Sequence, residues 1–113
     1  MLKTADLERS KRLKELGWDQ IDGDRFYSLM DESEFDCADR AVLINDGVPV
    51  ENFIVMPTAG EMIEWLLGEG CIIDIVSDFI TVRFKGQFLR LFSQDGLCNA
   101  LADAVIWVLE RKV

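Results

Sequence analysis

Apolar and polar positions form their clearest pattern in residues 56–111, where they predict a helix, three strands and a second helix. The first of these helices begins at Thr58, because Thr58 and Glu61 are spaced as a capping box, in which each side chain accepts a hydrogen bond from the other residue's backbone N–H. Glycines end this helix near residues 68–70. Its apolar face, at helical spacing, consists of Met62, Ile63, Trp65, Leu66 and Leu67.

Three short segments after this helix have the composition of β-strands, at residues 71–77, 79–85 and 87–92. The connections between them are too short for a parallel crossover, so we expect the strands to be antiparallel. The middle segment alternates between apolar and polar side chains, which indicates that one of its faces is buried. That face consists of Ile80, Val82 and Phe84.

The final helix is predicted to run from Ser93, its N-cap, to about Arg111. Gln94 and Asp95 then lie in its first turn, where the helix dipole favours acidic side chains. With the preceding helix and strands it completes a hydrophobic α-β-β-β-α unit. Its inner stripe is predicted to consist of Leu97, Leu101, Ala104, Val105, Val108 and Leu109.

The first half of the chain has a thinner apolar pattern. A helix is predicted over residues 4–16, with Gly17 at its end, and Trp18 is expected to fold back beneath it as a core anchor. Because this half has too few apolar residues for a core of its own, we expect it to pack against the second half. Further strands are predicted at residues 25–30 and 40–44, and an extended run at residues 50–56.

Length and composition predict a single domain over residues 1–113, since half of the 113 residues are apolar and no linker or repeat interrupts them. The predicted fold class is α+β, an antiparallel sheet packed by helices with the C-terminal α-β-β-β-α unit. No segment approaches the roughly 20 apolar residues that span a membrane. The charged N-terminal segment has no apolar secretory sequence, so we expect a cytoplasmic protein without a membrane partner.

Histidine and cysteine content excludes several kinds of chemistry. The chain has no histidine and three widely spaced cysteines, Cys37, Cys71 and Cys98, which we interpret as reduced residues packed as small hydrophobes. A structural zinc site would need four ligands, mainly cysteine and histidine. Catalytic Cys-His and Ser-His-Asp sets are impossible. We therefore predict a protein that is not an enzyme and holds no cofactor. Metal-assisted carboxylate chemistry remains the enzymatic alternative.

Charge is distributed unevenly along the chain, whose net charge is −9. Residues 18–51 carry ten acids and two bases, a net charge of −8. Nucleic-acid binding depends on neutralising phosphates with lysine and arginine, so this balance argues against a nucleic-acid partner. The same field favours encounter with a basic protein. The alternative is that the acids only keep a small protein in solution.

Five carboxylates lie in residues 31–39. Because carboxylate oxygens are the ligands of hard divalent cations, we consider whether this segment binds one. Their spacing does not match an EF-hand loop, which needs alternating ligands, a central glycine and a distal glutamate. A second acidic group around Gly23 lacks that glutamate, because Met30 stands at the twelfth position counted from Asp19. We therefore favour a solvated acidic loop over a metal site.

A non-enzymatic protein-interaction module is the function that these features predict. Its docking surface would be acidic, with Phe35 as a possible aromatic anchor. The alternative is an inhibitor or immunity-type protein that masks a basic nuclease or nucleic-acid-binding protein, which the same charge would serve. The predicted partner-binding residues are Asp22, Asp24, Asp31, Glu32, Glu34, Phe35, Asp36 and Asp39.

Several short motifs carry a resemblance to a known family. They are Gly17-Trp18 after the first helix, Pro57-Thr58 before a helix that contains Trp65, the paired strands after Gly70, and the alanine-rich final helix at residues 97–105. In their order along most of the chain they resemble small uncharacterised phage and prophage proteins of the phage α-β-α sandwich domain type. The acidic segment 31–39 has no counterpart in that pattern. The family has no established activity, so the resemblance implies a mobile-element origin and a fold.

Overall fold

Four α-helices and six strands are present in the computed structural model, which describes residues 3–94 and 96–112. In chain order the elements are α1 (Leu7–Glu15), β1 (Arg25–Ser28), β2 (Ser33–Asp36), α2 (Cys37–Asn45), the 3-10 helix η1 (Val50–Asn52), β3 (Phe53–Val55), α3 (Ala59–Gly68), β4 (Ile72–Val76), β5 (Phe79–Phe84), β6 (Gln87–Phe92) and α4 (Leu97–Lys112).

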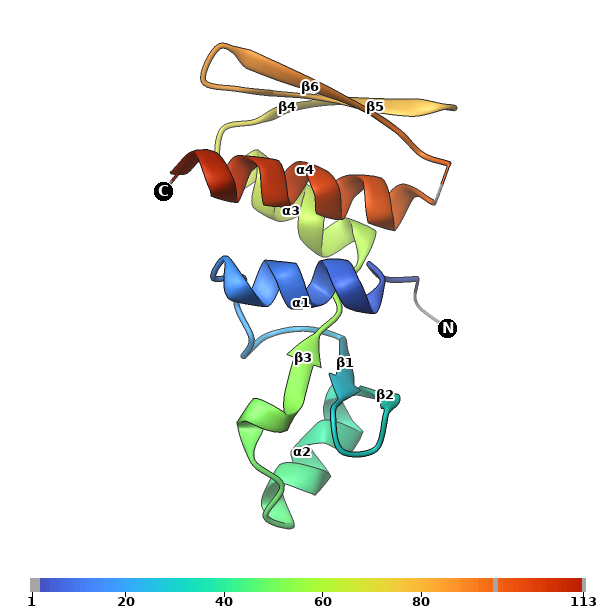
Figure 1. Ribbon diagram of the computed structural model, residues 1–113, viewed down its shortest axis with the longest axis vertical. Helices are drawn as coiled ribbons and strands as arrows, with labels where there is room; N and C mark the ends of the chain where they lie inside the picture. Colours follow the sequence, from blue (N-terminus) through green and yellow to red (C-terminus); the bar gives the residue numbers. More distant parts are fainter. Residues whose placement is uncertain (1–2, 95, 113) are drawn as a thin grey trace.

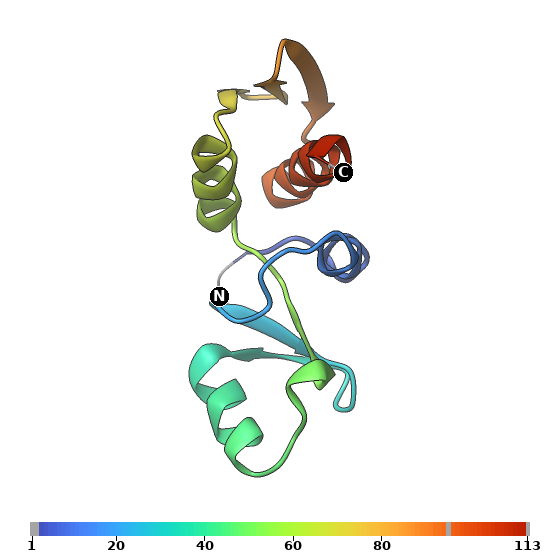
Figure 2. The ribbon, with the colours of Figure 1, turned by 90° about the vertical axis from the view of Figure 1, so that its left-hand side faces the viewer.

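These elements are stacked along the longest axis of the molecule, whose extents are 47 × 29 × 19 Å (Figure 1). One end is the sheet of β4, β5 and β6, and α3 and α4 pack beneath it. Helix α1 lies on the other side of α4, and the sheet of β1, β2 and β3 with α2 forms the opposite end, as the turned view also shows (Figure 2). The predicted α+β class is confirmed, with the antiparallel strands divided between two sheets, in the orders β2-β1-β3 and β4-β5-β6.

The capping box at the start of α3 is formed as predicted. Thr58 Oγ1 accepts a hydrogen bond from Glu61 N–H at 3.3 Å, and Glu61 Oε1 accepts one from Thr58 N–H at 2.9 Å. The helix ends at Gly68, and Gly70 follows with φ +84°, a left-handed conformation that favours glycine. The sequence therefore predicted both ends of this helix correctly.

Strand β5 buries the face that its alternating pattern predicts. Ile80 and Val82 are fully buried and Phe84 is 6% exposed, and all three lie on the side of the sheet that packs on the helices. β5 pairs with β4 and β6 in antiparallel register, as expected from the short connections. The predicted α-β-β-β-α unit is confirmed as α3-β4-β5-β6-α4.

Helix α4 begins at Leu97, so the prediction of Ser93 as its N-cap is wrong. The Ser93 carbonyl instead accepts from Gly96 N–H at 3.0 Å in a turn, and Gly96 has φ +99°, which interrupts the helix. Gln94 precedes the helix, and Asp95 lies outside the described residues. Leu97 was placed in the inner stripe but is 38% exposed at the helix start. The rest of that stripe is buried (Leu101, Ala104, Val105, Val108) or partly buried (Leu109).

Helix α1 begins three residues after the predicted start, because Asp6 is its N-cap and accepts from Arg9 N–H at 2.9 Å. Gly17 follows the helix with φ +99°. Trp18 donates its backbone N–H to the Leu13 carbonyl at 2.9 Å and is 9% exposed. The expectation that Trp18 folds back beneath the helix into the core is confirmed.

The strand predicted at residues 40–44 is wrong, since these residues belong to α2. Asp36 is the N-cap of this helix and accepts from Asp39 N–H at 2.8 Å. The acidic segment 31–39 is therefore strand β2 and the first turn of α2, where we expected a loop, although its carboxylates are exposed as expected. Strand β1 ends at Ser28, and the predicted extended run at 50–56 contains η1 before β3.

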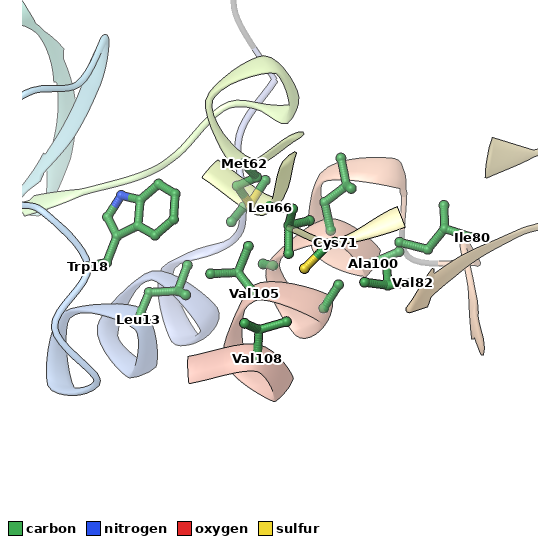
Figure 3. Close-up of a cluster of buried hydrophobic side chains, with 14 of the residues drawn as sticks. Leu13, Trp18, Met62, Leu66, Cys71, Ile80, Val82, Ala100, Val105 and Val108 are labelled. Atoms are coloured by element: carbon green, nitrogen blue, oxygen red, sulfur yellow. The ribbon is translucent and has the colours of Figure 1, made fainter. Parts of the chain in front are cut away.

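One cluster of buried hydrophobic residues draws on both halves of the chain, which confirms that the first half packs against the second. Leu13 and Phe26 belong to it together with Met62 and Leu66 of α3 and the inner side of α4. Figure 3 shows Trp18 beside Leu13 at one end of this cluster and Ile80 of β5 at the other.

An ion-pair group also joins α1 to α4. Arg9 Nε lies 2.8 Å from Asp103 Oδ1, and Arg9 Nη1 lies 2.6 Å from Asp6 Oδ2. The hydrogen bonds and charges of these carboxylates, that of Asp103 first, raise the pKa of Arg9 further above its ordinary value. Arg9 therefore keeps its positive charge throughout the neutral pH range.

Candidate docking surface

The seven predicted carboxylates are exposed and belong to the end of the molecule formed by the sheet β2-β1-β3 and α2 (Figure 1). We call them the acidic face: Asp22, Asp24, Asp31, Glu32, Glu34, Asp36 and Asp39. The antiparallel register pairs Arg25 with Asp36, which brings Asp24, Asp36 and Asp39 to one end of the β1-β2 hairpin. Asp31 and Glu32 lie in the turn at its other end, about 10 Å away for four-residue strands.

Some of these residues also have structural contacts. Asp36 caps α2, Asp31 Oδ2 accepts from Ser28 Oγ at 3.1 Å, and Glu34 Oε1 lies 3.7 Å from Arg25 Nη2. Phe35, the predicted aromatic anchor, is partly buried against the core cluster. The side chains of Asp24, Glu32 and Asp39, in contrast, have no hydrogen bond or ion pair within residues 3–94 and 96–112.

Both bases of residues 18–51 are engaged inside this end of the molecule. The Arg40 guanidinium lies 4.2 Å from the centroid of the Phe26 ring and donates to the carbonyls of Gln20 and Ile21 at 3.4 and 3.3 Å. The Arg25 side chain is 20% exposed and lies beside Glu34. The exposed negative charge of the acidic face is therefore left largely uncompensated at the surface.

An open cleft of about 390 Å³ lies between the loop after α1 and helix α3. We call it the tryptophan cleft, because Trp18 and Trp65 line it with their ring centroids 5.7 Å apart and their planes tilted by 53°. The sequence predicted these tryptophans only as core residues, and no sequence signal pairs two residues that are 47 positions apart. The cleft is also lined by four acidic residues, Asp19, Asp22, Glu61 and Glu64.

The opposite end of the molecule has a different surface. The outer face of the sheet β4-β5-β6 exposes large apolar side chains, with Ile72 at 64%, Phe88 at 63% and Phe92 at 66%. Arg83 and Arg90 are exposed on the same face, where Arg90 lies 4.8 Å from the centroid of the Phe79 ring. The acidic face thus lies at the end remote from this mixed apolar and basic surface (Figure 1).

Within residues 3–94 and 96–112, no group of three or more cysteine, aspartate or glutamate side chains is arranged to hold a metal ion. In the same part of the chain, no helix has the length and apolar character needed to cross a bilayer.

The three cysteines are free thiols with different exposures: Cys37 is exposed, Cys98 is partly buried and Cys71 is buried. Burial raises the pKa of the Cys71 thiol, and the charge of Glu69 adds to the rise. A higher pKa means less thiolate at a given pH, and the thiolate is the reactive form.

Thiol modification at pH 8 is therefore expected to proceed in order of exposure, with Cys37 first and Cys71 only as the protein unfolds. Stopped-flow absorbance with a disulfide reagent measures the phases, and Cys37→Ser is expected to remove the fastest one. A fast phase that persists in this variant, with Cys71 modified under native conditions, would contradict the burial of Cys71.

Comparison of the chain with models of protein families, with curated proteins and with solved structures finds no match to any of them. The resemblance to phage α-β-α sandwich domains therefore stays a prediction from the sequence motifs.

Proposed function

We propose that the protein is a non-enzymatic interaction module that binds a basic protein through the acidic face. The observation that supports this proposal best is the use of Arg25 and Arg40 inside the molecule. Because residues 18–51 carry ten acids against two bases, and both bases are engaged within the fold, the surface carboxylates present a strong local negative potential. Such a potential speeds encounter with a positively charged partner and opposes nucleic-acid binding.

The strands and helix under the acidic face give this surface a fixed shape. Asp36 is fixed as the cap of α2 and Asp31 as part of the hairpin turn, so the spacing of the carboxylates is set by backbone geometry. A preordered surface loses less conformational entropy on binding than a disordered acidic tail. Selectivity among basic partners would follow from that spacing.

Two variants with the same net charge test the proposal. One neutralises the acidic face at residues whose side chains have no structural contact (Asp24→Asn, Glu32→Gln, Asp39→Asn). The control neutralises three exposed carboxylates elsewhere (Glu8→Gln, Asp74→Asn, Asp78→Asn). A peptide of alternating arginine and serine residues is titrated by calorimetry at low and high salt. Since exposed charge pairs contribute about 0.5 kcal/mol each, the first variant is expected to bind about tenfold more weakly.

The control variant is expected to bind within about twofold of the wild type at a salt concentration of about 0.15 M, where screening over about 8 Å limits the reach of distant charges. Equal weakening of both variants would show that only net charge matters and would contradict a docking surface. The inhibitor alternative is tested with the same proteins by adding them to basic nucleases. Unchanged cleavage across the panel would remove the support for that alternative.

A further inference from the structure

The tryptophan cleft combines aromatic rings with carboxylates on one concave surface. Trp65 is partly exposed, and Trp18 lines the cleft although it is only 9% exposed. Their planes are tilted by 53°, and both tryptophans line the cleft, Trp65 from α3 and Trp18 from the loop after α1. At about 390 Å³ it is within the size range of small-molecule and side-chain pockets, about 300–1,000 Å³.

All charged side chains among the described residues that line the cleft are negative. Asp19 and Glu61 are held in place, since Asp19 Oδ1 accepts from Ile21 N–H at 2.8 Å and Glu61 belongs to the capping box of α3. Asp22 and Glu64 are exposed, and within residues 3–94 and 96–112 neither side chain has a hydrogen bond or ion pair. The cleft therefore offers two fixed carboxylates and two whose oxygens are available to a ligand.

Aromatic faces and carboxylates share one kind of ligand. An organic cation is attracted by the π-face of tryptophan, the strongest of the aromatic side chains in this respect, and its N–H groups bond carboxylates. A metal ion would use the carboxylates but gain nothing from the rings. A guanidinium group fits both, because it is planar, stacks on aromatic rings and donates in a fixed fork.

We propose that the tryptophan cleft binds a cationic side chain, arginine or lysine, of the basic protein partner. This inference rests on the proposed function and specifies where the partner is anchored. Asp22 belongs both to the acidic face and to the cleft, so the two surfaces are continuous. Tryptophan and arginine are enriched among binding hot spots, which lie in desolvated pockets, while surrounding charges mainly steer the encounter.

The molecule already holds one cation near this site. Lys112 Nζ, from the last turn of α4, lies 5.7 Å from the centroid of the Trp65 ring and is paired with Glu69. Trp65 is thus placed so that its ring accepts a cation. A positive charge at this position opposes the entry of another, and Lys112→Gln is therefore expected to strengthen ligand binding about twofold to threefold.

The probe is N-acetyl-arginine amide, titrated into ¹⁵N-labelled protein while the tryptophan indole N–H signals are followed by NMR. The signals of Trp18 and Trp65 are expected to shift with saturation at about millimolar ligand, the affinity reached by ligands of this size. The signal of Trp107, which is on α4 and does not line the cleft, is expected to stay unchanged. N-acetyl-citrulline amide, neutral and of the same shape, is expected to shift none of them.

Matched variants distinguish the contribution of the tryptophan rings to binding from that of the carboxylates. Trp65→Leu keeps an apolar side chain but removes the π-face, and it is expected to weaken binding about fivefold or more, whereas Trp107→Leu leaves it unchanged. Glu64→Gln and Asp22→Asn are each expected to weaken binding about twofold to fivefold, with Asp74→Asn as the control. N-acetyl-lysine amide and choline are further ligands. Binding of choline more tightly than either side-chain analogue would overturn the proposal in favour of a free quaternary amine.

The outcomes also separate this inference from the proposed function. If the arginine–serine peptide binds wild-type protein and is weakened by the acidic-face variant, but N-acetyl-arginine amide leaves the Trp18 and Trp65 signals unmoved, docking is correct and the cleft is not its anchor. If the amide binds the cleft while both triple variants bind the peptide equally, the cleft is a cation site and the acidic face is not a docking surface.

Discussion

Replacing Phe26 with alanine is expected to lower the free energy of unfolding by about 3–5 kcal/mol, the range for deletion of a buried aromatic ring. Phe26 is fully buried at the centre of the sheet β2-β1-β3, where it pairs with Phe35 on one side and Val55 on the other. It belongs to the core cluster that also contains residues of α3 and α4. Its removal leaves a cavity at the junction between the acidic end and the rest of the molecule.

The Phe26→Ala substitution also removes a contact between the sheet and helix α2. The Arg40 guanidinium is stacked 4.2 Å from the centroid of the Phe26 ring, and this contact holds the first turns of α2 against the sheet. Without the ring, Arg40 keeps its two long hydrogen bonds to the carbonyls of Gln20 and Ile21 and a more distant contact with Phe53, whose ring centroid is 5.9 Å away. We therefore expect α2 to loosen in Phe26→Ala, and Phe26→Leu to lose less stability because it fills most of the space.

Urea unfolding followed by tryptophan fluorescence measures this effect. The matched control is Phe88→Ala, which removes the same side chain from the outer face of the sheet β4-β5-β6, where it is 63% exposed. It is expected to change the free energy of unfolding by no more than about 0.5 kcal/mol. Similar losses for the two variants would contradict the core position of Phe26.

Local signals in the sequence determined what could be predicted of the fold. The capping box at Thr58, the alternation of residues 79–85 and the glycines after α1 and α3 each act over a few residues, and these features are in the structure as predicted. Short apolar runs are ambiguous, because a strand and one side of a helix look alike over five residues. Residues 40–44 were assigned to a strand for this reason.

The signal for α2 was present in the polar residues before that run. Asp36 is followed three residues later by Asp39, whose backbone N–H it caps, and Arg40 faces the sheet through its stacking on Phe26. An arginine that packs inward interrupts the apolar side of the helix, where Leu43 and Ile44 pack against the core cluster, so this side is only partly apolar in the sequence. Whether residues 40–44 form a helix or a strand therefore depends on tertiary packing, which cannot be seen in a short segment of the sequence.

The tryptophan cleft shows the same limit for the candidate site. Asp22 could be selected from charge alone, and its place in the acidic face follows from the composition of residues 18–51. Its neighbours Trp65 and Glu64 come from α3, which meets the loop after α1 only through the packing of α1, α3 and α4. Periodicity predicted Trp65 as a core residue on the apolar face of its helix, but which residue its ring would meet depends on helix orientation in three dimensions.

Replacing Asn52 with alanine is expected to lower the free energy of unfolding by about 2–3 kcal/mol, because it leaves buried polar groups without partners. Asn52 is 8% exposed, its Oδ1 accepts from Met30 N–H at 2.8 Å, and its Nδ2 donates to Ser28 Oγ at 2.9 Å. Ser28 Oγ also accepts from Asp31 N–H at 3.1 Å. One buried amide thus holds the hairpin turn that carries Asp31 and Glu32 of the acidic face.

Urea unfolding gives the stability of Asn52→Ala, and hydrogen exchange at Met30 N–H reports the turn directly. The exchange rate is expected to rise more than the loss of global stability explains, since the turn loses its own hydrogen bond. Asn45→Ala, at the exposed end of α2, is the matched control and is expected to cost no more than about 0.5 kcal/mol. A double-mutant cycle with Ser28→Ala is expected to give a coupling energy of about 1 kcal/mol or more. Additive losses would show that the two side chains act separately and would contradict a shared hydrogen-bond network in the turn.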